Sequence, residues 1–326
     1  MRSKTAEGQR AARSGMAKSR RHAAGSLEEA VAEKIAALRL PTAFSRTVDT
    51  TYLEIAGPLL ARSMRAKRQL VAGICGCQGS GKSTLAAFLK LLLEWENRRA
   101  AIVSLDDLYL TKQERQTLAR EIHPLLRTRG VPGTHDVALG LQTLGKLRAA
   151  GEISRIAIPR FDKARDDRAP RKEWDVFKGR PDFVLFEGWC VDARPQPRAA
   201  LRRPVNRLER DCDPDRIWRR YVNDQLAGPY RKLFAGIDLL IFLQAPSFAC
   251  VYKWRGLQEK KLRRSGRGNA VMDRKKLETF IMHYERLTLW MLKEMPARAD
   301  ILLPLAPDQR IRAVRIRGRR AKPSKS

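Results

Sequence analysis

A glycine-rich stretch at residues 76–83 constrains this chain more than any other feature of its sequence. It matches the P-loop pattern Gly-x-x-x-x-Gly-Lys-Ser at every specified position. In that motif a strand ends in a turn whose backbone N–H groups point inward. The helix that follows directs its positive N-terminal dipole at a bound anion. The sequence therefore predicts a site for the phosphates of a nucleotide.

Each residue type of the P-loop has a role in that chemistry. Small glycines allow the backbone to approach the phosphates, Lys82 reaches the β- and γ-phosphates, and the Ser83 hydroxyl takes a Mg²⁺ position. An apolar strand candidate at 70–75 and a helical spacing at 83–95 flank the motif, as the motif requires. The residues expected to bind ATP are Gly76, Gly79, Ser80, Gly81, Lys82, Ser83 and Thr84.

Strand and helix candidates alternate along the 326 residues without an internal repeat. This order predicts an α/β fold of the P-loop NTPase type, a three-layer sandwich whose mostly parallel sheet has helices on both faces. We expect four parts: a basic disordered arm at 1–25, a helical preface at 26–68, the P-loop domain at 69–306 and a basic C-terminal strand or tail at 307–326.

The net charge of +31 is partly concentrated in the two ends. Basic arms can touch nucleic acid, or they can be solvated tails in an arginine-biased protein. Five cysteines form neither a disulfide framework nor a paired zinc pattern, which favours a cytoplasmic location. Residues 1–25 also have the composition of a transit peptide, so organelle targeting stays open. No apolar run approaches the ~20 residues of a membrane span, so we expect no membrane partner.

Acidic residues follow two of the apolar strand candidates. Asp106 and Asp107 end one strand, and Glu187 ends another. In parallel sheets ligands gather at the carboxyl ends of the strands. We therefore expect Asp106 to orient or deprotonate an acceptor hydroxyl near the metal, and Glu187 to bind Mg²⁺ or its waters. Helix capping and turn formation are the alternative uses of such acids.

A basic helix, a glycine tip and a second helix follow the fourth strand candidate. This segment, at about 252–270, has the composition of a helical lid that brings arginines to a transferred phosphate, with Arg263 as the catalytic candidate. The alternative is a solvated helix end, where the C-terminal dipole of the helix stabilises cationic side chains.

Two loops, at 129–136 and 159–163, are dense in Arg, Lys, His and Asp. A small hydroxylated anion needs Arg or Lys for its carboxylate and Asp for its hydroxyl groups. These loops are therefore candidates for the acceptor site.

The chain resembles the P-loop D-glycerate 3-kinases of plants, fungi and bacteria from about residue 45 to 306. The resemblance depends on residues 106–111, 123–136, 159–168, 186–189 and 252–259, of which Arg-Gly-x-x-Gly-Thr-His-Asp and Pro-Arg-Phe-Asp-Lys are the most specific. That family is similar in fold to phosphoribulokinase, uridine kinase and bacterial pantothenate kinase.

The resemblance implies ATP- and Mg²⁺-dependent phosphorylation of a small alcohol by a monomer or homodimer, with the 3-hydroxyl group of D-glycerate as the leading acceptor. Pantothenate, uridine or a sugar phosphate in the same fold is one alternative, and a nucleic-acid-associated ATPase is another. Residues 192–212 depart from the plant pattern because they are rich in Pro and Arg. The substrate contacts that the resemblance implies are Asp107, Tyr109, Arg129, His135, Asp136, Arg160, Asp162, Lys163 and Trp189.

Overall fold

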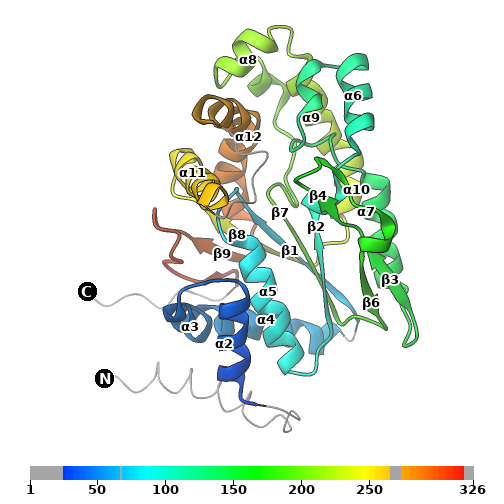
Figure 1. Cartoon of the computed structure of the whole chain (residues 1–326), viewed down its shortest axis with the longest axis vertical. Coiled ribbons are helices and arrows are strands. Elements are labelled where there is room, and N and C mark those ends of the chain that lie inside the picture. Colours follow the sequence, from blue (N-terminus) through cyan, green and yellow to red (C-terminus); the bar gives the residue numbers. More distant parts are fainter. Residues whose placement is uncertain (1–24, 67, 265–272, 319–326) are drawn as a thin grey trace.

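The computed structural model describes residues 25–66, 68–264 and 273–318, without the side chains of residues 258–264 and of Arg274. A central sheet runs through this part of the chain, with helices on both of its faces (Figure 1). Across these ranges no helix is both long enough and apolar enough to cross a membrane.

The central sheet has six strands in the order β10-β9-β8-β1-β7-β2. All neighbours pair in parallel except β10, which is antiparallel to β9. The predicted mostly parallel sheet is therefore confirmed. Its strands are β1 (Leu70–Gly76), β2 (Ala100–Ser104), β7 (Phe183–Gly188), β8 (Leu239–Gln244), β9 (Ile301–Pro304) and β10 (Arg315–Ile316).

Successive strand residues point to opposite faces of the sheet, and helices bury both faces. In β7, for example, Leu185 joins the core on one face and Phe186 joins the core on the other. Four helices cover the first face, and these are α2 (Leu27–Ala37), α4 (Leu53–Ala66), α5 (Lys82–Trp95) and α11 (Phe248–Arg264).

The second face is covered by α7 (Val137–Arg148), α10 (Pro229–Phe234) and α12 (Arg274–Glu294). Away from the sheet lie α6 (Lys112–Glu121), α8 (Arg207–Cys212) and α9 (Ile217–Ala227), as Figure 1 shows. The short turn α3 (Ser45–Thr47) joins the preface. Ser26, Thr111 and Asp136 cap α2, α6 and α7, as their positions before helical patterns predict.

The pattern of residues 154–160 predicts a short strand, and the structure has one there, but it does not join the central sheet. β3 (Arg155–Ile158) pairs with β6 (Asp175–Lys178), and β4 (Phe161–Asp162) pairs with β5 (Asp167–Arg168). The two small antiparallel pairs form an arm beside the edge strand β2 (Figure 1). An apolar strand pattern specifies extended backbone, whereas the choice of pairing partner depends on tertiary packing.

Two sequence patterns need correction. Gly57-Pro58 predicts a bend or break in the preface helix, but α4 is unbroken through Pro58, with Ile55 and Leu59 buried on either side of it. The Pro- and Arg-rich residues 192–212 predict a loop, but they include α8. The C-terminal segment, expected as a basic strand or tail, is described through Gly318, and its β10 pairs with β9.

A buried ion pair fixes α8 to α12. Glu209 accepts two hydrogen bonds from Arg286, each 2.6 Å long, and both side chains are more than nine-tenths buried. The attraction between two buried charges in this geometry offsets part of the free-energy cost of removing both charges from water. This pair therefore helps to hold residues 200–209 against α12.

We predict that Glu209→Gln lowers the free energy of unfolding by about 3–5 kcal/mol, because it leaves Arg286 buried without a compensating charge. Urea denaturation followed by circular dichroism measures this change. Asp211→Asn is the matched control, because Asp211 forms an exposed pair with Arg210 on the same helix. Equal effects of the two substitutions would contradict a role for the buried pair.

Candidate active site

The P-loop has the backbone conformation that phosphate binding requires. Gly79 and Gly81 have φ angles of 78° and 90°, in the left-handed region that favours glycine. Gly81 is the N-cap of α5, so the positive end of that helix faces the loop. A Cβ atom added to Gly76 would lie 2.5 Å from Oγ of Ser80. Close contacts therefore exclude side chains at Gly76 and Gly79, and the left-handed φ disfavours one at Gly81.

Glu187 lies beside the P-loop at the end of β7. Its Oε1 accepts hydrogen bonds from the hydroxyl groups of Ser83, at 2.9 Å, and Ser104, at 3.0 Å. Its Oε2 is buried and has no hydrogen-bond partner among the described residues. A hard divalent cation suits an oxygen in this position, and Mg²⁺ commonly takes one carboxylate and one hydroxyl in addition to phosphate oxygens. Within the described ranges no group of three or more His, Cys, Asp or Glu could hold a metal by itself.

Lys82 lies between two carboxylates. Burial alone lowers the pKa of its ammonium group, but the negative charges of Glu187 and Asp106 outweigh burial and raise the pKa above its ordinary value. Lys82 is therefore charged at any working pH. It can place a fixed positive charge next to phosphates bound at the P-loop.

Asp106 occupies the short helical turn that follows β2. Its carboxylate accepts a hydrogen bond from Nζ of Lys163 at 2.8 Å and lies 3.3 Å from the hydroxyl oxygen of Tyr109. Burial raises the pKa of Asp106, but the charges of Lys163 and Lys82 lower it more and hold it well below its ordinary range. Asp106 is therefore ionised and accepts hydrogen bonds.

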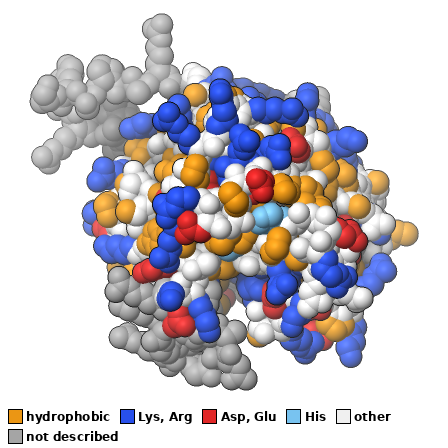
Figure 2. All heavy atoms as spheres, turned by 90° about the horizontal axis from the view of Figure 1, so that it is seen from above, with side chains coloured by type: hydrophobic (Ala, Val, Ile, Leu, Met, Phe, Trp, Pro, Cys, Tyr) orange, Lys and Arg blue, Asp and Glu red, His pale blue; other side chains and the backbone are white. Residues whose placement is uncertain are grey.

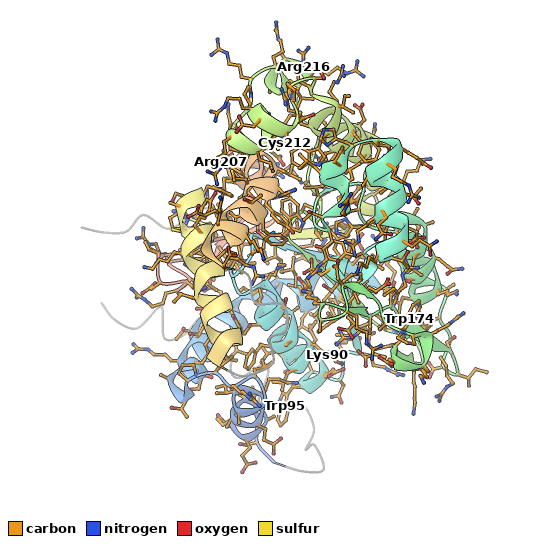
Figure 3. All side chains as sticks on the ribbon, turned by 45° about the horizontal axis from the view of Figure 1, so that its top comes forward. Lys90, Trp95, Trp174, Arg207, Cys212 and Arg216 are labelled. Atoms are coloured by element: carbon orange, nitrogen blue, oxygen red, sulfur yellow. The ribbon has the colours of Figure 1, made fainter. Side chains whose placement is uncertain are left out.

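One cleft of about 890 Å³ brings seven of the predicted residues together. It runs between the central sheet and the arm formed by β3 to β6, and Lys90, labelled in Figure 3, lines it from α5. The predicted site residues that line this cleft are Ser83, Asp106, Asp107, Arg160, Asp162, Lys163 and Glu187.

The cations of the arm face carboxylates across the cleft. Asp107 accepts a hydrogen bond from the backbone N–H of Phe161 at 3.0 Å and from Arg160 at 3.2 Å. Burial raises the pKa of Asp107. Asp162 accepts from the backbone N–H groups of Ala164 and Arg165 and so caps the turn of its own loop. Asp107 therefore ties the arm to the sheet, and Asp162 shapes the loop that carries Lys163.

Two other predicted residues serve in structural contacts next to the cleft. Arg129 forms an ion pair with Asp166. Asp136 accepts from the N–H of Leu139 as the N-cap of α7 and from Arg168 at 2.9 Å. These pairs place the loop at 129–136 against the arm.

His135 is buried beneath Tyr109, with its ring stacked 4.5 Å from the tyrosine ring. Its Nδ1 lies 2.6 Å from the hydroxyl oxygen of Tyr230, and that oxygen also accepts from the N–H of Gly133 at 2.9 Å. The Tyr230 hydroxyl can then donate its own proton to Nδ1 of His135. With Nδ1 as the acceptor, we place the imidazole proton on Nε2. Burial lowers the pKa of His135 to about 3, so the ring is neutral. Its buried Nε2 has no hydrogen-bond partner among the described residues.

Trp189 lies beneath the same loop. It is fully buried, and its indole N–H donates to the carbonyl oxygen of Gly130 at 2.8 Å. Gly130 has a φ of 143°, and a Cβ atom there would lie 2.1 Å from the hydroxyl oxygen of Tyr284. That hydroxyl donates to the carbonyl oxygen of Arg129 at 3.1 Å. Trp189 and Tyr284 therefore hold the loop that carries Arg129 and His135.

The predicted lid falls largely outside the described residues. The backbone of Arg263 belongs to α11, but its side chain is not described, nor are residues 265–272. Trp254, near the middle of the same helix, contacts the P-loop: a Cβ atom on Gly79 would lie 2.7 Å from Cβ of Trp254.

Four residues that the sequence analysis did not single out support the site, and they are Ser104, Tyr230, Tyr284 and Gln309. None belongs to a motif. The nearest signal is the position of Ser104, which directly precedes the strand-end turn that carries Asp106.

Gln309 brings the C-terminal segment onto the P-loop. Its Nε2 donates to the carbonyl oxygen of Gly79 at 2.6 Å. The turn that carries Gln309 is held by a hydrogen bond from the indole N–H of Trp254 to the carbonyl oxygen of Pro307, at 2.9 Å. Gln309 has a φ of 71°, a left-handed conformation that costs a non-glycine residue free energy. This turn therefore forms part of the nucleotide site instead of a free tail.

No family model matches the chain, but the chain is similar to several known proteins. The chain is 35% identical over 227 residues to the uncharacterized kinase mug58 of Schizosaccharomyces pombe, covering 67% of this chain and 79% of that protein. It is 32% identical over 225 residues to the chloroplastic D-glycerate 3-kinase of Arabidopsis thaliana, covering 66% of this chain and 46% of that protein. The chain thus spans less than half the length of the plant protein.

The fold is also similar to that of a solved kinase. A D-glycerate 3-kinase from Cryptococcus neoformans superposes with a TM-score of 0.69 at 26% sequence identity, covering 82% of this chain and 99% of that chain. The alternation of strands and helices around the P-loop is therefore shared with a kinase of small molecules.

We predict that Gln309→Ala weakens ADP binding by about 3- to 10-fold, because it removes one hydrogen bond that positions Gly79. Isothermal titration calorimetry measures the dissociation constant. Gln309→Gly should bind ADP as weakly but unfold at a higher temperature than Gln309→Ala, since glycine adopts the left-handed φ without strain. Asp308→Asn, in the same exposed turn, should leave ADP binding unchanged. Unchanged binding in Gln309→Ala would contradict the proposed role.

Proposed function

Because the chain belongs to the P-loop D-glycerate 3-kinase family, we propose that it transfers the γ-phosphate of ATP to the 3-hydroxyl group of D-glycerate. The observation that carries this proposal is one cleft in which Ser83, Glu187 and Asp106 of the sheet side face Lys163 and Arg160 of the arm. Lys82 lies at the P-loop end, where the charges of Glu187 and Asp106 act on it. That end suits a metal-bound phosphate chain, and the end formed by Asp106 and the arm suits a small hydroxylated anion.

On the nucleotide side, backbone N–H groups of the P-loop and Lys82 bind the phosphates. Ser83 and Glu187 hold Mg²⁺, with Ser104 orienting the glutamate through its second hydrogen bond to Oε1. When bound, Mg²⁺–ATP supplies the phosphoryl group and spreads its negative charge over the metal. The free Oε2 of Glu187 then obtains the partner that it lacks among the described residues.

On the acceptor side, Asp106 accepts the hydrogen bond of the reacting hydroxyl group. Its pKa lies well below the ordinary range, so it is a weak base, and its main contribution is to orient the hydroxyl group. Phosphoryl transfer needs little proton abstraction before the transition state, because that state is loose. Positioning by an ionised carboxylate is therefore sufficient.

The carboxylate group of the acceptor binds to the cationic side chains of the cleft. Lys163 and Arg160 are exposed on one side, so their ion pairs with Asp106 and Asp107 can rearrange around a bound anion at small cost. His135 offers a neutral Nε2–H donor in a dry environment, which suits a hydroxyl or carboxylate oxygen of the acceptor. Tyr109 covers the ring of His135 and limits its access to water.

A substrate screen tests the acceptor. ADP release is measured with D-glycerate, pantothenate, uridine and ribulose 5-phosphate, each at matched ATP and Mg²⁺ concentrations. We expect the highest kcat/KM with D-glycerate and a product phosphorylated on its 3-hydroxyl group. The Lys82→Ala variant is the control for contaminating kinases and should lose most of the turnover. Preference for pantothenate, uridine or the sugar phosphate would reassign the acceptor while keeping the reaction.

We predict that Asp106→Asn lowers kcat by about 10²-fold, because a neutral amide accepts a weaker hydrogen bond from the hydroxyl group and cannot balance the charge of Lys163, so the acceptor is misplaced. Steady-state kinetics and the KM for ATP separate this loss from a loss of nucleotide binding. Asp175→Asn is the matched control: Asp175 lines the same cleft but is largely exposed, and we expect little change. Comparable losses in both variants would argue against a specific role for Asp106.

A further inference from the structure

An arginine-rich surface covers one end of the molecule, away from the P-loop. Residues 192–220 contain nine arginines and no lysine. They fold into a short helical turn at Arg198–Leu201, α8 and the beginning of α9, at the end of the molecule where α8 lies in Figure 1. Eight of these side chains are exposed and define the arginine surface: Arg194, Arg198, Arg202, Arg203, Arg207, Arg210, Arg216 and Arg220.

The acidic residues of this segment do not neutralise the arginine surface. Glu209 and Asp213 are buried and are used by Arg286 and Arg219, which are also buried. Only Asp211 and Asp215 remain exposed between residues 194 and 220. Figure 2 looks onto this end and shows basic side chains over much of it, with fewer acidic ones between them. The exposed arginines therefore create a positive electrostatic field.

The arginines are carried by an ordered scaffold. Arg286 donates hydrogen bonds to the carbonyl oxygens of Ala200, at 3.0 Å, and Arg203, at 2.7 Å. Asn206 donates to the carbonyl oxygen of Met282 at 2.9 Å and caps α8. Contacts with α12 thus set the position of the backbone that carries Arg202, Arg203 and Arg207. Arg207 and Arg216, labelled in Figure 3, lie at the periphery of this end.

The chemistry of these side chains indicates the partner. A guanidinium group is a planar fork that binds phosphate oxygens through two hydrogen bonds, and it keeps its charge at every working pH. A surface that serves solubility mixes the two signs of charge, whereas this one is almost entirely of one sign and one residue type. The ligand is therefore a regular array of phosphates.

We propose that the arginine surface binds the phosphate backbone of a nucleic-acid double helix. Single strands are bound by aromatic side chains on which bases stack, and Trp218, the one aromatic residue between 192 and 220, is buried. Contacts with the backbone alone give binding that depends on salt and not on base sequence. This surface is independent of the kinase reaction, whose residues lie in the cleft.

The test compares the full chain with two triple variants of equal charge. Arg202→Gln/Arg203→Gln/Arg207→Gln alters the arginine surface, and Arg39→Gln/Arg46→Gln/Arg65→Gln alters exposed arginines of the helical preface. Fluorescence anisotropy measures binding to duplexes of ~20 base pairs, of DNA and of RNA, over a salt series. We expect the logarithm of the association constant to fall linearly with the logarithm of the salt concentration. The first variant should make this slope shallower by about 2–3 and reduce the affinity at ~0.1 M salt on the order of 100-fold.

The second variant should bind duplexes nearly as the unaltered chain does. Both variants should keep their ADP release with ATP and acceptor, which shows that they are folded. Preference for the DNA or the RNA duplex identifies the source of the phosphates. The proposal is overturned by absence of duplex binding, by equal losses in the two variants, or by tighter binding to single strands or to vesicles containing phosphatidylserine.

Discussion

The parallel register of β1, β7 and β2 is the constraint on which the site depends. Cys75 pairs with Gly188 between β1 and β7, and Ser104 pairs with Glu187 between β2 and β7. All three strands therefore end at one edge of the sheet. A slip of one residue in β7 would turn Glu187 toward the opposite face and separate it from Ser83. Backbone hydrogen bonds thus set the relative positions of Ser104, Glu187 and the P-loop.

The charged side chains of the cleft form ion pairs, and there is room for a substrate to bind beside them. Asp106 with Lys163 and Asp107 with Arg160 join the central sheet to the arm. Each pair keeps two charges in a partly dry cleft, where an unpaired charge would be costly. Under the proposed function, a bound acceptor would supply a competing negative charge for these cations and a hydroxyl donor for these carboxylates.

Uncharged and buried groups hold the loops that carry these charges. Trp189 and Tyr284 hold Gly130 and Arg129 in place, Tyr230 orients His135, and Gln309 holds the carbonyl of Gly79. Supporting groups of this kind are what hold reacting side chains within about 0.5 Å of a productive geometry. The helix α12 is central to this arrangement, because it holds both the acceptor loop through Tyr284 and the arginine surface through Arg286.

Local patterns in the sequence determined the P-loop, the strand-end positions of Asp106 and Glu187, and the caps Thr111 and Asp136. Each depends only on the backbone conformation of a few neighbouring residues. The pairing of β3 with β6, the order of the C-terminal segment and the roles of Ser104, Tyr230, Tyr284 and Gln309 were decided by the tertiary structure. The hydrogen bonds of these four residues join positions 83, 95, 155 and 230 residues apart. Such contacts leave no periodic trace in the sequence, because they depend on how the layers pack and not on local conformational preference.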